Sequence, residues 1–195
     1  DTVTLSGIEA LIVTQSSTEV VVRLAVSDGA AGRVVTLLSV SGAIVTVSDL
    51  WTYAAEGTIT GVVPNNGQYG TRVTISGSSL RGSGTEVVGV TLAGTAVLSL
   101  TDETDSLVEV VADHASAAEN GDIVLTANTG ATVTAAGAWT QTEEGAVSSV
   151  SPGTGQYGTK VAIAGTGLLG AGNEVDSITL GGVLVETLVS QSDKL

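Results

Sequence analysis

The sequence predicts an all-β fold in which antiparallel β-sandwiches repeat in tandem. Apolar residues make up 43% of the 195 residues, but aromatic residues make up only 3%, and Phe, Met and Cys are absent. The apolar content comes from Val, Ile, Leu and Ala interleaved with Thr and Ser, a mixture that favours half-buried strands over helices. Short runs that alternate apolar and polar residues are separated by Gly-rich turns, with no helical period, which indicates a sandwich.

The tandem repeat is visible when the chain is aligned with itself. The segment NNGQYGTRVTISG (65–77) returns as GTGQYGTKVAIAG (153–165), 88 positions later. The same offset pairs Trp51 with Trp139. The strand sequence VTLSG near the start also returns, with a one-residue slip, as VTLAG and then as ITLGG. Self-similarity at a fixed period is the signature of a tandem array.

The period divides the chain into one complete repeat and two partial ones. We expect the C-terminal part of a first repeat at 1–56, the complete repeat at 57–144 and the N-terminal part of a third at 145–195. Each partial repeat lacks strands of the complete one, so its sheet edges would be open to strand addition. A longer continuous chain or head-to-tail donation between copies would close them. Both arrangements generate a fibre, because a head-to-tail contact that does not close on itself propagates.

Within the complete repeat, the strands follow from the alternation of apolar residues. The run RVTIS (72–76) places Val73 and Ile75 on one face and its polar residues on the other. We interpret 112–122 as a connecting loop. Strands of the same pattern are expected at 107–111, 122–127 and 131–135. The predicted core consists of Val73, Ile75, Leu92, Val108, Val110, Ile123, Leu125 and Trp139.

These segments resemble a known family. GTITGVVPNNGQYGTRVTISGSSL (57–80) is similar to the opening of an IPT/TIG domain, an immunoglobulin-like fold, and VVGVTLAGT and GDIVLTANTGATVTAAGAWTQ resemble its later strands. The family normally finishes on an aromatic pair, and that position reads WTY at 51–53 and WTQ at 139–141. The likeness covers nearly the whole chain and implies tandem immunoglobulin-like sandwiches. It specifies a fold and not a chemistry.

Charge excludes several classes of partner. Six Lys and Arg residues against 20 Asp and Glu residues give a net charge of -14, so a nucleic acid or an anionic bilayer would be repelled. Without Cys, the chain has no disulfide and no thiolate metal site. No apolar run approaches the ~18 to 20 residues that span a membrane, and the start lacks a signal-peptide pattern. We therefore expect a soluble segment, with any export signal or anchor outside it.

The family resemblance implies a location. Its members include transcription-factor domains, receptor ectodomains and large tandem arrays on cell surfaces. Only the last setting suits an acidic, Lys-poor, Thr-rich chain with repeats this similar to each other. We expect an extracellular or cell-surface protein whose solvent-facing Thr and Ser could carry O-linked glycans.

The recurring GQYGT motif has the composition of a tight turn. Glycine tolerates positive φ, and tyrosine can lay its ring on the end of a sandwich. Ligand contact by the two tyrosines is the alternative. The structural residues expected here are Gly67, Tyr69 and Gly70 in the complete repeat, and Gly155, Tyr157 and Gly158 in the third.

Trp51 and Trp139 close their repeats at the position where the resembling family keeps an aromatic residue. In a core made otherwise of small aliphatic side chains, a buried indole would anchor both sheets. We therefore expect both tryptophans to be core anchors. An exposed platform that stacks on carbohydrate is the alternative.

The stretch TDETD gathers three carboxylates, Asp102, Glu103 and Asp105, of the kind that Ca²⁺ binds. The equivalent stretches TQSST (14–18) and SQSD (190–193) do not repeat the cluster, and a site essential to an array should recur. The sequence therefore predicts a solvated acidic loop, with a weak calcium site as the alternative.

The sequence offers no assembled catalytic group. His114 is the only histidine, and its counterpart in the first copy lies near Ser27. With no Cys and no recurring arrangement of Ser, His and acid, the parts for nucleophilic or metal catalysis are missing. We expect no enzyme activity and no cofactor.

Two functions fit these observations. The first is a structural segment of an extracellular fibre, filament or stalk, whose partners are adjacent repeats or copies of itself stacked end to end. The short linkers AAEGTITGV and TEEGAVSSV favour stiff packing of neighbours. The second is an adhesion or receptor module that binds protein or glycan through end loops. The sequence favours the fibre, because GQYGT is the same in both copies.

Overall fold

The computed structural model describes residues 1–27 and 33–190, and every regular element within these ranges is a β-strand. The all-β fold predicted from the sequence is confirmed. The described residues include no helix with the length and apolar character needed to cross a bilayer. The chain divides into two units, Asp1–Ala55 and Glu56–Leu195, which are described separately.

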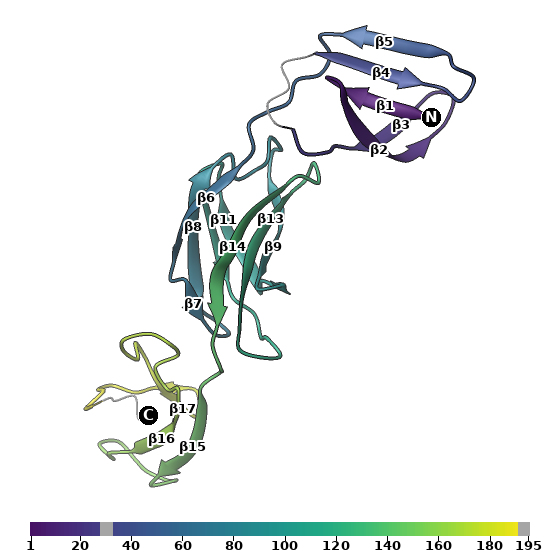
Figure 1. Cartoon of the computed structure of the whole chain (residues 1–195). Helices are drawn as coiled ribbons and strands as arrows, with labels where there is room; N and C mark the ends of the chain where they lie inside the picture. The colour runs from purple at the N-terminus through teal and green to yellow at the C-terminus, as the bar shows by residue number, and fades with distance from the viewer. Residues whose placement is uncertain (28–32, 191–195) are drawn as a thin grey trace. The chain divides into compact units, whose positions relative to one another are not determined.

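The complete repeat is a sandwich of two sheets that lie face to face (Figure 1). One sheet contains, in spatial order, β11 (Ser99–Glu103), β12 (Leu107–Val111), β8 (Arg72–Ser78) and β6 (Thr58–Val63). The other contains β10 (Thr95–Ala96), β9 (Val87–Leu92), β13 (Glu119–Ala127), β14 (Thr132–Gln141) and β7 (Asn66–Gly67). Neighbours are antiparallel except β7, which runs parallel to β14.

The expected strands are present, and three of them extend beyond their apolar patterns. β8 continues to Ser78, two residues past the predicted 72–76. The strand at 107–111 has the expected bounds. β13 begins at Glu119 and β14 continues to Gln141, because the two form a hairpin whose register joins Glu119 to Gln141. Backbone pairing therefore extends both strands beyond their alternating segments. The connecting loop predicted at 112–122 covers only 112–118, because residues 119–122 belong to β13.

The core of the complete repeat lies between the two sheets. All eight residues predicted for it are buried there, joined by Leu80, Val87, Val90, Ala112 and Val133. Trp139 is the largest of them and has no exposed surface. Its indole Nε1 donates a hydrogen bond to Oε1 of Gln141, at 3.0 Å. Trp139 is therefore a core residue, and its ring is not exposed for stacking on carbohydrate.

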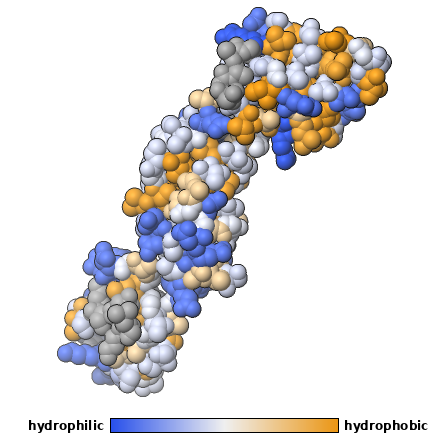
Figure 2. All heavy atoms as spheres, in the orientation of Figure 1, coloured by the Kyte–Doolittle hydropathy of each residue, from blue (hydrophilic) through white to orange (hydrophobic). Residues whose placement is uncertain are grey.

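The first unit is a single five-stranded sheet. Its spatial order is β3 (Val20–Arg23), β2 (Ile8–Gln15), β1 (Thr2–Leu5), β4 (Val34–Leu38) and β5 (Ile44–Ser48). Among its described residues, only Val3, Leu5 and Ala10 are buried in a core, and Trp51 packs against them. Figure 2 shows apolar side chains on the surface of this unit; Val26 is 84% exposed and Val40 is 87% exposed.

The third part of the chain contains two hairpins. The first joins β15 (Ala146–Ser151) and β16 (Ala162–Thr166), and it matches β6 and β8 of the complete repeat at the same 88-residue offset. The second joins the two-residue strands β17 (Thr179–Leu180) and β18 (Val183–Leu184). Most of the described residues here are exposed, so this part has much less buried apolar surface than the complete repeat.

Replacing Trp139 with alanine should lower the free energy of unfolding by about 3 to 5 kcal/mol, because the cavity left by a fully buried indole cannot be refilled by small aliphatic neighbours. The midpoint of urea unfolding measures this change. The matched control is Tyr157→Ala, whose ring is 90% exposed and whose loss should change stability by less than about 0.5 kcal/mol. An unmoved midpoint in Trp139→Ala would contradict the core assignment.

Candidate functional site

Three segments of the complete repeat meet where the chain leaves it. They are the GQYGT loop (67–71), the loop after β12 (112–118) and the linker (142–145), and we call them together the linker-binding end. β7 pairs with the last two residues of β14, which places the GQYGT loop beside the linker. Gly70 N donates to Ala112 O and Ala112 N donates to Thr71 O, each at 2.9 Å, which fixes the second loop against the first.

The GQYGT loop has the same geometry in both of its copies. In the complete repeat, Gln68 N donates to Thr71 Oγ1 and Thr71 N donates to Gln68 O, both at 3.1 Å. In the third repeat, Gln156 and Thr159 make the same two bonds, both at 3.0 Å. The loop conformation therefore follows from its own sequence and does not depend on its surroundings.

The glycines of this loop serve two different purposes. Gly70 and Gly158 have φ values of +84° and +82°, as expected for a tight turn. Gly67 and Gly155 do not have positive φ, so that expectation is wrong for them. A Cβ at Gly67 would lie 2.5 Å from Oγ1 of Thr71, which shows that this position is glycine because the threonine side chain approaches its backbone closely.

Tyr69, His114 and Glu144 form a stacked and hydrogen-bonded group at the linker-binding end. The rings of Tyr69 and His114 lie parallel, with centroids 3.7 Å apart and an interplanar angle of 7°. His114 Nδ1 lies 2.6 Å from Oε1 of Glu144 in the linker. Both members of the histidine–glutamate pair are partly exposed, so the pair contributes modestly to stability. Tyr157, the counterpart of Tyr69, is 90% exposed.

Hydrogen bonds from two backbone N–H groups of the linker hold it to the GQYGT loop. Thr142 N donates to Gly67 O at 2.7 Å. Gly145 N donates to the side-chain Oε1 of Gln68, also at 2.7 Å. The first and last residues of the linker are therefore both bonded to the GQYGT loop. The sequence patterns did not predict that His114, Glu144 and Gln68 make contacts at the linker. The one feature that pointed to such a role was the recurrence of glutamine at 68 and 156.

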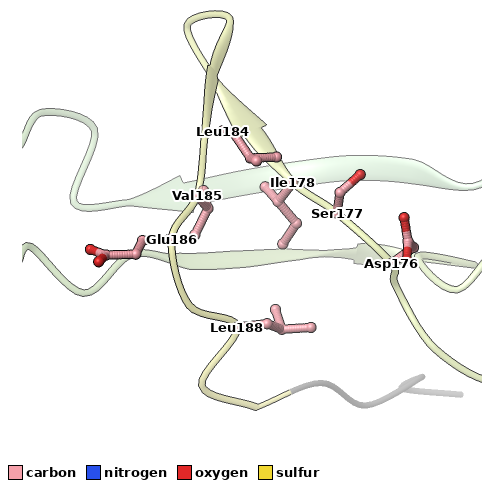
Figure 3. A pocket seen from close by; sticks show the side chains of 7 residues that line it. All are labelled: Asp176, Ser177, Ile178, Leu184, Val185, Glu186 and Leu188. Carbon is pink, nitrogen blue, oxygen red and sulfur yellow. The ribbon is translucent and has the colours of Figure 1, made fainter.

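A hollow in the third part of the chain lies between the segment before β17 (176–178), Leu184 of β18 and the segment after β18. Figure 3 shows its apolar residues Ile178 and Leu188 between Asp176 and Glu186, whose carboxylates lie at opposite ends. Val185 N donates to Ile178 O at 2.8 Å, as Val97 N donates to Val90 O in the complete repeat. Because Val90 belongs to the sandwich core and Val97 packs against it, we interpret the hollow as an uncovered core surface and not as a ligand site.

The acidic stretch TDETD is joined to an arginine. Arg81 Nε lies 2.8 Å from Glu103 Oε2, and Arg81 Nη2 donates to Glu103 Oε1 at 3.1 Å. Backbone N–H groups of Arg81 and Glu103 donate to Asp105 and Asp102 respectively. The expectation of a solvated loop is wrong in two respects. Asp102 and Glu103 lie in strand β11, and the side chain of Glu103 is only 18% exposed. From residue 191 onward, the equivalent stretch in the third copy lies outside the described residues.

The same arginine shifts the titration of Glu103. The hydrogen bond from Arg81 lowers the pKa of Glu103 below its ordinary value of 4.5. Burial opposes this effect, and the hydrogen bond from the backbone N–H of Val87 adds to it. The hydrogen bond to Glu103 in turn raises the pKa of Arg81. All three carboxylates of TDETD accept hydrogen bonds from donors of the protein. Within the described ranges, no group of three His, Cys, Asp or Glu side chains is arranged to hold a metal ion.

Comparison with known proteins identifies the family. The profile described as IPT/TIG domain matches residues 58–140 and 146–195. The chain belongs to the IPT/TIG domain family. The two matched segments follow one another, so the predicted recognition of tandem IPT/TIG repeats is confirmed. Both segments contain a copy of the GQYGT motif.

Three solved structures are similar to this IPT/TIG chain at low identity. The full extracellular region of plexin A4 is 19% identical with a TM-score of 0.46, over 86% of this chain and 15% of that one. An auxiliary nutrient binding protein from Bacteroides thetaiotaomicron is 20% identical with a TM-score of 0.37, over 47% and 22%. A Bacteroides ovatus glucan-utilization protein, SGBP-B, solved with a mixed-linkage heptasaccharide, is 14% identical with a TM-score of 0.34, over 75% and 39%.

This chain therefore spans less than half the length of each of these proteins. A comparison with curated protein sequences found no match.

Removing divalent cations with a chelator should leave the midpoint of thermal unfolding unchanged, because protein donors already satisfy the carboxylates of TDETD. Scanning calorimetry with and without the chelator, and with added CaCl₂, measures this. A drop of several degrees on chelation that calcium reverses would show a calcium site.

Replacing Arg81 with leucine, the residue at the equivalent position 169, should destabilise the protein in a pH-dependent way. Because the pKa of folded Glu103 is depressed, its contribution to stability is present above about pH 4.5 and is lost as the pH falls through the lower folded pKa. The stability difference between wild type and variant should therefore shrink between about pH 7 and pH 3.

Urea unfolding of both proteins at the two pH values measures this difference. Arg72→Leu, a change at an exposed arginine of β8, is the matched control and should show no such dependence. An Arg81→Leu effect of equal size at both pH values would contradict the role of the Arg81–Glu103 pair.

Proposed function

We propose that the chain is a structural repeat segment of an extracellular fibre, filament or stalk, assembled by end-to-end stacking of near-identical β-sandwiches. The attachment of the linker carries this proposal, because Thr142 near the end of the complete repeat and Gly145 at the start of the next repeat both donate hydrogen bonds to the GQYGT loop of the complete repeat. A short linker bonded at its first and last residues has little freedom to bend. Since loop and linker recur with the 88-residue period, the same contact can be used again along an array.

Composition and surface support an array that associates with itself. The net charge of -14 disfavours nucleic acid and anionic membrane as partners. Apolar side chains stand exposed on both partial repeats, including Val26 and Val40 in the first and Val183 in the third. Adjacent repeats or further copies would cover such surfaces. On this proposal the repeats are divided at 1–56, 57–144 and 145–195, and the segment is a non-catalytic module at the cell surface.

A single observation favours a second function, an adhesion module that binds glycan or protein through its end loops. The ring of Tyr157 is 90% exposed at the end of the third repeat, and exposed aromatic rings are suited to stacking on sugars. A panel of oligosaccharides tested by titration against wild type and Tyr157→Ala would identify such a ligand. An oligosaccharide that binds wild type but not Tyr157→Ala would favour this function over the fibre.

The 195-residue chain should form regular filaments under negative-stain electron microscopy, and these should be longer at about 150 mM salt than at about 10 mM. Copies that each carry a charge of -14 repel one another at low ionic strength, and salt screens that repulsion. Sedimentation of the same samples gives the assembled fraction. Monodisperse particles at both salt concentrations, at high protein concentration, would contradict the fibre.

A further inference from the structure

The side chain of Gln68 bonds the GQYGT loop to the start of the next repeat. Its Oε1 accepts a hydrogen bond from Gly145 N at 2.7 Å, although the two residues are 77 positions apart. Gln68 is half-buried, whereas Gly145 is exposed. The turn itself uses the backbone of Gln68, which bonds to Thr71 in both directions. The carboxamide is therefore not needed for the turn and is available for the linker.

The loop fixes the backbone of this glutamine whether or not a linker is bonded to its side chain. Gln156 makes the same two bonds to Thr159 that Gln68 makes to Thr71. The loop geometry is the same although Tyr69 stacks on His114 and Tyr157 is 90% exposed. A site that is already formed loses little conformational freedom on binding. The GQYGT loop has the properties of a preorganised binding site.

The partner of this site is a glycine that also recurs. Gly145 occupies the position of Gly57 one period earlier. A Cβ at Gly145 would collide with the carbonyl oxygen of Gly167, and one at Gly57 would collide with that of Ser79. The first residue of each repeat is therefore packed against the residue that follows β8 or β16 and has no room for a side chain. What it presents to the preceding repeat is its backbone N–H.

We propose that the GQYGT loop is a preformed docking site for the backbone of the next repeat, with Gln68 as the residue that recognises the N–H of Gly145. The occupant is a further repeat of this kind, identified by the glycine with which it begins. Gln156 is the equivalent residue in the second copy of the loop. This inference deepens the proposed function, since it names the contact through which repeats would stack, but the bond itself lies within one chain.

The test is amide hydrogen exchange measured by NMR on the 195-residue chain. In Gln68→Ala, the Gly145 amide should exchange roughly fivefold to tenfold faster than in wild type, because its acceptor is gone. Gln68→Glu keeps an acceptor oxygen and should restore the slow exchange. Gln156→Ala removes the same side chain from the other copy of the loop and should leave Gly145 unchanged.

The Thr142 amide, which donates to Gly67 O, reports whether the loop remains folded in each variant. Unchanged Thr142 exchange with faster Gly145 exchange supports the docking role. Unchanged Gly145 exchange in Gln68→Ala overturns it, as does a Gln68→Glu variant that exchanges as fast as the alanine variant. Filament formation is scored separately: a wild-type chain that makes no filaments while Gly145 responds to Gln68 refutes the fibre and leaves the docking contact standing.

Discussion

The burial of one indole is the constraint on which the complete repeat depends. Two facing sheets leave a space about 10 Å thick, and the core that fills it contains only Val, Ile, Leu and Ala besides Trp139. The ring has no exposed surface, and its N–H donates to Gln141 Oε1. The Nε2 of Gln141 is itself buried without a hydrogen-bond partner among the described residues. Gln141 is also the β14 residue that pairs with Gly67. The core anchor thereby fixes the strand end from which the linker leaves.

In the first unit, the tryptophan is followed two positions later by a tyrosine in place of glutamine. Tyr53 stands where the complete repeat has Gln141, and its ring meets Trp51 edge to face, with centroids 5.7 Å apart. Trp51 Nε1 and the Tyr53 hydroxyl are both buried without a hydrogen-bond partner among the described residues. Over the same ranges, the core of this unit has only three buried residues. The two tryptophans are thus equivalent in sequence, but only Trp139 has both a closed core and a satisfied N–H group.

The fold could be predicted from the sequence because its signals are local or periodic. Alternation of apolar and polar residues predicts the strands, and the 88-residue offset pairs the two tryptophans. The contacts of the linker-binding end were not predictable in this way, because they join residues far apart, such as His114 to Glu144. They also involve residues that no single motif requires. Gln68 was the exception that recurrence could have revealed, since a tight turn needs the glycine and threonine of GQYGT but not its glutamine.

The linker-binding end combines a contact between residues that recur in the sequence with a contact between residues that do not, and the difference bears on how an acidic array can hold together. The stack of Tyr69 on His114, with its bond to Glu144, belongs to one junction, because the first copy has Ser27 near the histidine position. The bond from Gly145 to Gln68 joins two recurring residues and is neutral. A neutral amide–backbone bond is not weakened by salt, nor does it add charge to a chain that carries -14. Repeats joined by backbone recognition can therefore be stacked without oppositely charged partners, whereas an exposed ion pair at every junction would be screened and would contribute little.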